Sequence, residues 1–227
     1  MLAYGKNILF MTDPKEIKKV YLSRKDEEIF NYLKTHKIHY VMTTTEQLNK
    51  MTKANHQGII IERDEYKYYT LEHINNEEFL LILDHLEDPH NLGAIIRTAE
   101  AAGIKSIIIP KDRSVSITDT VIKTSVGTTS KVKVIKVTNI VETIKKLQKN
   151  DYFVYASAMD GKDARNIDFS GKKVLIIGNE GKGISSLVRN TCDEIIKIPM
   201  IGEVNSLNAS VAAGILIFKM GGLIWIT

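Results

Sequence analysis

The chain has 227 residues, of which 44% are hydrophobic and 26% charged, with 14 glycines and 4 prolines. A chain of this length buries roughly 70% of the surface that its unfolded form exposes, and this composition excludes the disordered and collagen-like classes. The single cysteine, Cys192, excludes an intramolecular disulfide. No Cys/His cluster has the spacing of zinc ligands, so we expect no bound metal.

The N-terminal residues and the net charge bear on where the protein resides and what it binds. Residues 1–13 contain neither the uninterrupted apolar h-region nor the small-residue cleavage site of a signal peptide, and no stretch approaches the roughly 18 apolar residues of a membrane span. We therefore expect a cytoplasmic protein without a membrane anchor. The net charge of +4 permits contact with nucleic acid without establishing it. Basic residues outnumber acidic ones by 12 to 9 in residues 1–70 and by 7 to 2 in residues 105–136, which fits RNA binding or merely solvated faces.

Residues 1–70 alternate between strand-like and helix-like patterns, which predicts a small α/β unit. We expect strands at 17–22, 39–42 and 58–61 and helices at 27–35 and 45–51. The polar stretch 62–78 indicates an edge strand that runs into a linker. We place the linker at 71–78.

The remainder of the chain alternates again between strands and helices. We expect strands at 79–83, 106–109, 132–137, 152–156 and 174–177 and helices at 91–102, 140–149 and 206–220. This alternation predicts a mostly parallel sheet with helices on both faces. The last helix is apolar on nearly every side, so we expect it to be buried.

Ligands bind at the carboxyl ends of strands in open parallel sheets, which directs attention to the segments after Leu83, Ile177 and Ile198. In the first segment, Asn91 is either the N-cap of the following helix or a functional amide. Arg97 follows an apolar run, where an unpaired charge is costly. Arg97 is therefore either half of a structural ion pair or a functional cation.

The second segment carries Gly178, Gly181 and Gly183, which allow a ligand to approach the backbone closely. Their order, G-x-x-G-x-G, differs from the dinucleotide pattern G-x-G-x-x-G, and Lys182-Gly183 does not fit a P-loop. NAD and nucleoside triphosphates are therefore disfavoured. The loop is either an ordinary turn or a binding loop, and Glu180 in its middle favours binding.

The third segment leads directly into the last helix. Ser206 suits an N-cap and Asn208 suits the first turn, which is the purely structural interpretation. However, Ser206, Asn208 and Ser210 together place several hydrogen-bonding groups at the end of a strand. This concentration predicts a pocket.

Three motifs in this order resemble the SpoU (TrmH) branch of the SPOUT methyltransferases. They are N-L-G-A-I-I-R-T-A at 91–99, I-G-N-E-G-K-G-I at 177–184 and I-P-M-x-G-x-x-x-S-L-N-A-S-V-A at 198–212. Through Tyr4-Gly5 and residues 55–58, the N-terminal unit resembles the ribosomal-protein-like RNA-binding domain of the bacterial ribosomal RNA guanosine 2′-O-methyltransferases.

The resemblance implies a fold and an activity. The fold is α/β, with a parallel SPOUT sheet closed by a deep trefoil knot over residues 79–227 and an RNA-binding domain over residues 1–70. The implied activity is S-adenosylmethionine-dependent methylation of a ribose 2′-hydroxyl, in a guanosine of large-subunit ribosomal RNA. The implied assembly is a homodimer whose site is completed across two subunits.

The resemblance also assigns site residues. The catalytic group it implies comprises Asn91, Arg97, Glu180, Ser206 and Asn208, and the cofactor group comprises Gly178, Asn179, Ile198, Met200 and Leu207. A ribose hydroxyl is a poor nucleophile, so its developing negative charge needs stabilisation. Because the pKa of arginine exceeds 12, we expect Arg97 to act electrostatically, and proton abstraction by it stays an open alternative.

Three other functions stay open. A transfer-RNA 2′-O-methyltransferase of the same family is the nearest, followed by a non-catalytic RNA-binding or ribosome assembly factor. The presence of Arg97, Glu180 and Asn208 disfavours the non-catalytic reading. A small-molecule oxidoreductase is the most distant alternative, because the glycine order does not fit a dinucleotide.

Overall fold

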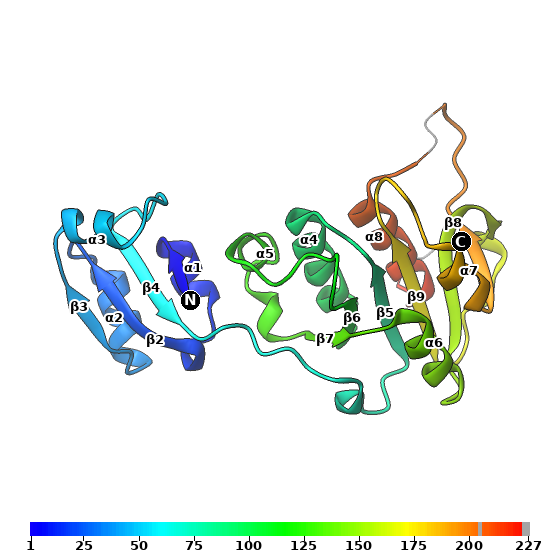
Figure 1. Ribbon diagram of the computed structural model, residues 1–227, viewed down its shortest axis with the longest axis horizontal. Coiled ribbons are helices and arrows are strands. Elements are labelled where there is room, and N and C mark those ends of the chain that lie inside the picture. The colour runs from blue at the N-terminus through cyan, green and yellow to red at the C-terminus, as the bar shows by residue number, and fades with distance from the viewer. Residues whose placement is uncertain (204–205, 224–227) are drawn as a thin grey trace.

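The computed structural model describes residues 1–203 and 206–223 and contains two sheets. Figure 1 shows the smaller, N-terminal sheet with its helices at one end of an elongated molecule and the larger sheet at the other. An extended segment joins the two parts. The chain is α/β in both.

The N-terminal unit is a mixed sheet with strand order β1-β4-β2-β3. Its elements are β1 (Leu2–Tyr4), α1 (Lys6–Met11), β2 (Ile17–Leu22), α2 (Glu27–Thr35), β3 (Tyr40–Met42), α3 (Thr45–Met51) and β4 (Ile59–Arg63). The predicted strands and helices are confirmed to within two residues at each end, whereas the short β1 and α1 were not predicted. The edge strand expected beyond residue 62 is wrong, because β4 ends at Arg63 and lies between β1 and β2.

The larger sheet has six strands in the order β10-β8-β9-β5-β6-β7, and every neighbouring pair is parallel. The strands are β5 (Phe79–Asp84), β6 (Ser106–Pro110), β7 (Lys133–Val137), β8 (Phe153–Asp163), β9 (Lys173–Gly178) and β10 (Glu194–Lys197). The helices are α4 (Pro89–Ala101), α5 (Asp119–Thr124), α6 (Ile140–Gln148), α7 (Ser186–Thr191) and α8 (Ala209–Met220). The predicted parallel sheet is confirmed, and the trefoil knot stays a prediction.

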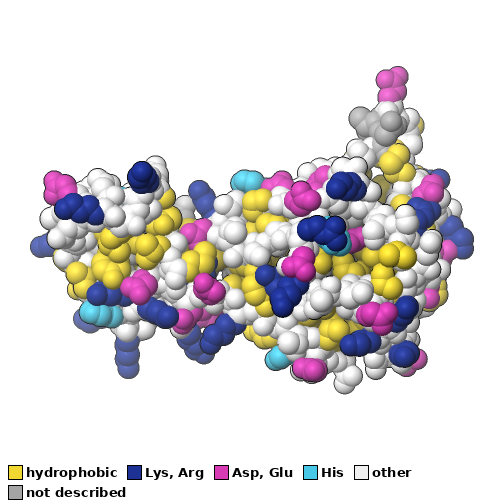
Figure 2. Space-filling view, viewed as in Figure 1, with side chains coloured by type: hydrophobic (Ala, Val, Ile, Leu, Met, Phe, Trp, Pro, Cys, Tyr) yellow, Lys and Arg dark blue, Asp and Glu magenta, His cyan; other side chains and the backbone are white. Residues whose placement is uncertain are grey.

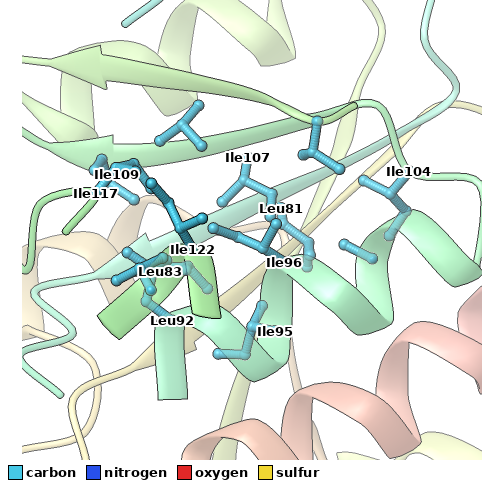
Figure 3. Close-up of a cluster of buried hydrophobic side chains, with 14 of the residues drawn as sticks. Leu81, Leu83, Leu92, Ile95, Ile96, Ile104, Ile107, Ile109, Ile117 and Ile122 are labelled. Carbon is cyan, nitrogen blue, oxygen red and sulfur yellow. The ribbon is translucent and has the colours of Figure 1, made fainter. Parts of the chain in front are cut away.

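Both faces of this sheet are covered, which explains the continuous apolar run in β5. Leu81 and Leu83 point to the face packed by α4, where Ile95 and Ile96 meet them in the core shown in Figure 3. The alternate residues of the strand belong to a second cluster, which includes Ile144 of α6. A strand buried on both sides needs apolar residues at every position.

The order of the strands predicts a crevice at the carboxyl ends of β5 and β9. From β5 the chain passes through α4 to β6 on one side, while β9 lies against the other side of β5. Asp84 at the end of β5 is the register partner of Gly178 at the end of β9. In open α/β sheets such a reversal of direction is where ligands bind.

Helix α8 departs from the expectation in two ways. It begins at Ala209 rather than at Ser206. It is also not buried all round, because Val211 and Ile215 are 49% and 38% exposed. The described residues therefore leave an apolar stripe of this helix uncovered.

The segment between the two sheets is hydrogen-bonded to the larger unit. Tyr69 makes a parallel bridge to Ile135 of β7, and its amide donates to the carbonyl oxygen of Val134 at 3.0 Å. The hydroxyl of Tyr68 accepts a hydrogen bond from the amide of Ile117 at 2.7 Å. The limits of the two domains and of the linker at 71–78 stay predictions.

Charge is spread over both parts of the molecule. Figure 2 shows Lys and Arg side chains interleaved with acidic ones on both lobes of the visible face. Within residues 1–203 and 206–223, no helix combines the length and apolarity needed to cross a bilayer. The same residues contain no group of three His, Cys, Asp or Glu side chains that could hold a metal ion.

Candidate functional site

A cavity of about 500 Å³ lies at the carboxyl edge of the larger sheet. Its walls are the second half of β8, the loop that follows β9, the segment that follows β10 and the first turns of α8. All five residues predicted to bind a cofactor line it, together with two of the five predicted catalytic residues: Gly178, Asn179, Ile198, Met200, Leu207, Glu180 and Ser206. Asn91, Arg97 and Asn208 are not part of the lining.

The loop after β9, residues 178–184, is held by its own hydrogen bonds. The backbone of Asn179 exchanges two hydrogen bonds with that of Gly183, at 3.0 and 2.9 Å. The side-chain oxygen of Asn179 accepts from the amides of Gly181 and Lys182, and its Nδ2 donates to the carbonyl oxygen of His85 at 2.9 Å. Every polar group of Asn179 is thus used to shape the loop.

Gly178 is required by the loop itself. A Cβ at this position would lie 2.4 Å from the carbonyl carbon of Gly183 and 2.6 Å from the amide nitrogen of Ile184. No side chain fits in that space, so any other residue would displace the wall of the cavity. Gly183 has a φ of +65°, the left-handed region that favours glycine.

Asp84 holds Ser185, the residue that follows this loop and caps α7, a contact that no sequence motif indicated. Its carboxylate is 1% exposed and accepts a hydrogen bond from the amide of Ser185 at 3.1 Å. The other carboxylate oxygen lies 2.6 Å from Nδ1 of His85. A carboxylate directly after a buried strand was the available signal, since a buried charge needs dedicated partners.

Asn91 joins the first motif to the second. Its Nδ2 donates to Oε1 of Glu180 at 2.6 Å, and Asn91 is only 6% exposed. The N-cap of α4 is Asp88, whose side chain accepts from the amide of His90, with Pro89 in the first turn. The N-cap interpretation of Asn91 is therefore wrong.

Arg97 lies on the outer face of α4 and is exposed. Within the described residues its guanidinium has neither an ion-pair nor a hydrogen-bond partner, so the structural ion pair is not found there. The expected burial in an apolar helix is also wrong. The apolar run 94–96 faces the core, while position 97 points away from it.

The segment after β10 makes far fewer hydrogen bonds than the loop after β9. Asn208 is the N-cap of α8, and its Oδ1 accepts from the amides of Ser210 and Val211. Ser206 is exposed and precedes the cap, so the N-cap interpretation of Ser206 is wrong. Among the residues that the structure describes, the backbone groups of Ile198, Met200 and Leu207 make no hydrogen bond.

One pair of opposite charges lies at the rim of the cavity. The Arg189 guanidinium makes two hydrogen bonds to the Asp160 carboxylate, at 2.9 and 2.8 Å, and lowers the pKa of that carboxyl. Cys192 lies outside the cavity, where burial raises the pKa of its thiol to about 12. A thiol in that state is a poor nucleophile.

Comparison with known proteins places both parts of the chain. Residues 78–218 match the model of the SpoU rRNA methylase family, and residues 4–69 match a model described as RNA 2′-O ribose methyltransferase substrate binding. A TrmH family tRNA/rRNA methyltransferase of Bacillus subtilis is 43% identical over 182 residues, which cover 77% of this chain and 73% of that protein.

Solved structures agree with these matches. An AdoMet-bound rRNA methyltransferase from Sinorhizobium meliloti is 25% identical with a TM-score of 0.78, and the match covers 99% of this chain and 88% of that one. A TrmH/SpoU tRNA modifying enzyme of A. aeolicus is 27% identical with a TM-score of 0.59, over 66% of this chain and 76% of that one. With its motifs, its parallel sheet and these matches, the chain belongs to the SpoU family of RNA methyltransferases.

Proposed function

We propose that this RNA methyltransferase transfers the methyl group of S-adenosylmethionine to the ribose 2′-hydroxyl of a guanosine in large-subunit ribosomal RNA. The observation that carries the proposal is the joining, in one chain, of a SpoU methylase region with a region that matches a 2′-O ribose methyltransferase substrate-binding model. A substrate-binding region of this description supports RNA as the substrate.

The extent of the structural matches supports a ribosomal substrate over a transfer RNA. The S. meliloti structure, named as an rRNA methyltransferase, covers 99% of this chain and therefore includes the N-terminal unit. The A. aeolicus structure, named as a tRNA modifying enzyme, covers 66%. The N-terminal unit thus accompanies the ribosomal activity in this comparison.

The cavity fits S-adenosylmethionine. Its volume of about 500 Å³ lies within the usual range of small-molecule sites. Met200 and Leu207 offer apolar surface for the flat adenine, and the backbone groups of Ile198, Met200 and Leu207, unpaired among the described residues, offer donors and acceptors for its polar edge. When bound, the cofactor supplies an electrophilic methyl group on a sulfonium.

Arg97 is the proposed electrostatic group for the ribose. As the 2′-oxygen attacks, negative charge develops on it, and a guanidinium that is free of other partners can stabilise that charge. Arginine keeps its proton at neutral pH, so its role is to stabilise and position rather than to abstract. The exposure of Arg97 allows RNA to reach it.

The remaining catalytic group has positioning roles in this proposal. The hydrogen bond between Asn91 and Glu180 ties the start of α4 to the loop after β9. Asn208 fixes the start of α8 and so holds the preceding Ser206 at the cavity wall. Ser206 is exposed there and free to hydrogen-bond the RNA.

We also propose that two copies associate through α8. Val211 and Ile215 form its exposed apolar stripe. This helix packs on α4, since Thr98 lies 3.8 Å from the position of a Cβ on Gly214. Association through the stripe would cover apolar surface and place Arg97 beside the interface. Sedimentation velocity should give a dimer, and a fully active monomer would contradict this assembly.

The substrate is tested by supplying labelled S-adenosylmethionine and separate RNA fractions from cells that lack the gene. The purified full-length protein is incubated with large-subunit, small-subunit and transfer RNA, and the nucleosides released by digestion are identified by mass spectrometry. We expect label in 2′-O-methylguanosine from the large-subunit fraction. Label only in transfer RNA would favour the alternative substrate, and label on a base would exclude ribose methylation.

A further inference from the structure

A second cavity, of about 630 Å³, opens between the two parts of the chain, far along the sequence from the methylase motifs. One wall comes from the end of α1 and the turn after it, a second from α2, and a third from the turn after α5 in the larger unit. We call it the interdomain cleft, and its lining residues are Phe10, Met11, Thr12, Asp13, Pro14, Tyr32, His36, Val126, Gly127 and Ser130.

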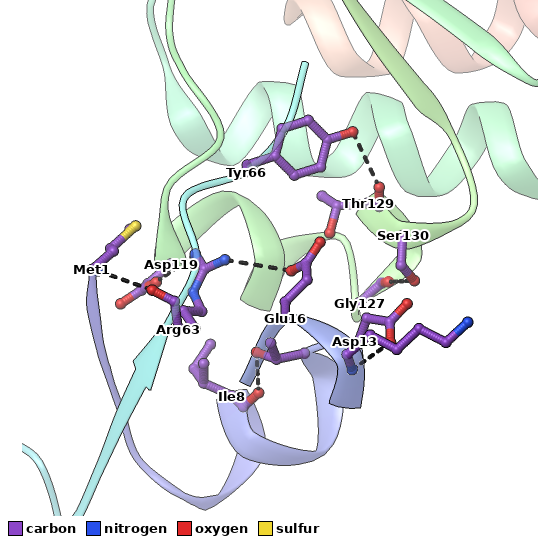
Figure 4. A network of polar contacts seen from close by, with 12 residues as sticks. Met1, Ile8, Asp13, Glu16, Arg63, Tyr66, Asp119, Gly127, Thr129 and Ser130 are labelled. Atoms are coloured by element: carbon purple, nitrogen blue, oxygen red, sulfur yellow. Dashed lines mark hydrogen bonds and ion pairs between the residues drawn. The ribbon is translucent and has the colours of Figure 1, made fainter. Parts of the chain in front are cut away.

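The walls of the cleft are brought together by close contacts between the two parts. Gly127 has a φ of +77°, and a Cβ there would lie 2.7 Å from the carbonyl oxygen of Met11. Nearby, the fully buried Arg63 of β4 donates to Asp119 of α5 at 3.2 Å and faces Glu16 at 3.7 Å, as Figure 4 shows. Partial burial raises the pKa of both carboxyls, and the side chains of Glu16 and Asp119 keep 33% and 26% of their surface exposed. The cleft is therefore bounded by a packed contact.

Three aromatic rings form one side of the interdomain cleft. Phe10 and Tyr32 meet edge to face with centroids 4.9 Å apart, and Tyr32 lies 4.5 Å from the ring of His36. Core rings of this protein are hidden: Tyr155 and Phe169, which also pack edge to face, are 5% and 8% exposed. Tyr32 is only half-buried and His36 is exposed, so these rings present surface to solvent.

One carboxylate lines the cleft together with these rings. Asp13 is the only carboxylate among the lining residues that the structure describes, and its Oδ1 accepts from the amide of Lys15. Within the described residues its second oxygen has no partner. Asp13 and Tyr32 both line the cleft, and burial together with the Asp13 charge raises the pKa of Tyr32. The cleft thus offers an unused acceptor beside a stacking surface.

Three exposed lysines lie next to the lining segments in the sequence. Each of three lining segments is directly followed by an exposed lysine: Lys15 follows Pro14, Lys37 follows His36, and Lys131 follows Ser130. Lys131 is paired with Glu100 at 3.2 Å, so Lys15 and Lys37 are the two that suit phosphates of the RNA. Unpaired bases are bound by stacking on aromatic rings and by hydrogen bonds to their Watson–Crick edges. Guanine presents two adjacent N–H donors on that edge, which match a carboxylate.

We propose that the interdomain cleft binds one unpaired guanine base of the RNA substrate, stacked on Tyr32 and His36 and read by Asp13. The proposal rests on the proposed function only in taking RNA as the substrate. The cleft is separate from the cavity at the carboxyl edge of the sheet, since the two share no lining residue. It selects a neighbouring nucleotide and takes no part in methyl transfer.

The test measures binding of fluorescent hexaribonucleotides to the full-length protein by anisotropy. One probe is hexauridylate, and the others replace the third uridine by guanosine or adenosine. We expect the guanosine probe to bind most tightly. Tyr32→Leu and His36→Ala should each weaken it by about 5- to 150-fold, the usual effect of losing one stacked ring. Asp13→Asn should remove the preference for guanosine and leave hexauridylate binding unchanged.

Matched controls separate the cleft from the rest of the N-terminal unit. Tyr40→Leu and His39→Ala remove an exposed tyrosine and an exposed histidine that do not line it, and both should bind like the parent. Thermal unfolding shows whether Tyr32→Leu is folded. His36→Ala removes an exposed side chain and keeps the test valid if Tyr32→Leu is not.

Several results would overturn the proposal. Equal affinities for the three probes would show that the protein does not recognise the base. Equal losses of affinity in the cleft and control variants would show that the base is not bound in the cleft. Cofactor binding and methyl transfer are measured in parallel on the same samples. Normal methyl transfer with unchanged probe binding in His36→Ala and Asp13→Asn refutes the cleft alone, whereas absence of transfer by the parent protein to any RNA refutes the proposed function.

Discussion

Two segments line the same cavity and differ in how their polar groups are used. In the loop of residues 178–184, the side chain and backbone of Asn179 are fully hydrogen-bonded within the protein. In the segment of residues 198–207, the backbone groups of Ile198, Met200 and Leu207 have no partner among the described residues. We infer that the first loop is a preformed wall and the second segment is the surface that recognises the cofactor.

The largest expected effect concerns Arg97, which belongs to neither segment. Replacing it by alanine should lower the rate of methyl transfer by about 100- to 1000-fold, the typical cost of one preorganised electrostatic group. Stability and cofactor affinity should be unchanged, because Arg97 is exposed and lies outside the cavity. Single-turnover kinetics and calorimetry measure the two quantities separately.

Arg113→Ala is the matched control, because it removes another exposed arginine from the same unit. Its transfer rate should stay close to that of the parent. Equal losses in both variants would mean that Arg97 contributes general RNA attraction rather than stabilisation of the reacting oxygen.

A glycine pair sharpens the comparison of the two segments. Gly178→Ala inserts a Cβ 2.4 Å from backbone, so it should lower the free energy of unfolding by about 1–3 kcal/mol and weaken cofactor binding. Gly202→Ala lies in the other segment, where a Cβ would have open space, and should leave the stability unchanged. Urea unfolding measures both, and equal stability of the two variants would show that the first loop is not rigid.

A second pair separates support from recognition. Asn179→Ala removes three side-chain hydrogen bonds and should cost about 1–3 kcal/mol of stability. Ser206→Ala removes an exposed hydroxyl and should stay within about 0.5 kcal/mol of the parent, yet lose methyl transfer. If Ser206→Ala is the less stable variant, the assignment of the two segments is reversed.

The smallest effect is expected at Cys192. Because its thiol pKa is about 12, little thiolate exists at pH 8, and iodoacetamide should leave the native thiol unmodified while alkylating it in urea. Reactivity of the native thiol should rise only as pH approaches 12. Cys192→Ser should keep full activity, and an inactive but folded variant would restore a covalent role for this residue.

Periodicity predicted much of the fold because the buried strands have strong local patterns. The apolar run at 79–83 is of the kind that a strand covered on both sides needs, and it is confirmed as β5. Short elements such as β1, α5 and α7 were missed, because three to six residues carry too little pattern. The bonds between Tyr69 and β7 join residues far apart in sequence, so no local signal predicts them.

The sequence predicted which residues lie near one another better than it predicted what each of them contacts, and their roles stay predictions. Seven of the ten site residues that the resemblance assigns line one cavity. The resemblance did not reveal that the polar groups of Asn179 are bonded within the protein or that Asp84 accepts a hydrogen bond from Ser185. Both contacts join segments that are far apart in the sequence. The exposure of Arg97 likewise depends on which face of α4 the neighbouring helices leave open.

Hydrogen exchange with and without S-adenosylmethionine tests the central claim most directly. Without cofactor, the amides of Gly181, Lys182 and Gly183 should already be protected, because each donates to Asn179. The amides of Met200 and Leu207 should exchange freely and become protected when the cofactor is added. Fast exchange in both segments before binding, or new protection confined to residues 178–184, would contradict the account.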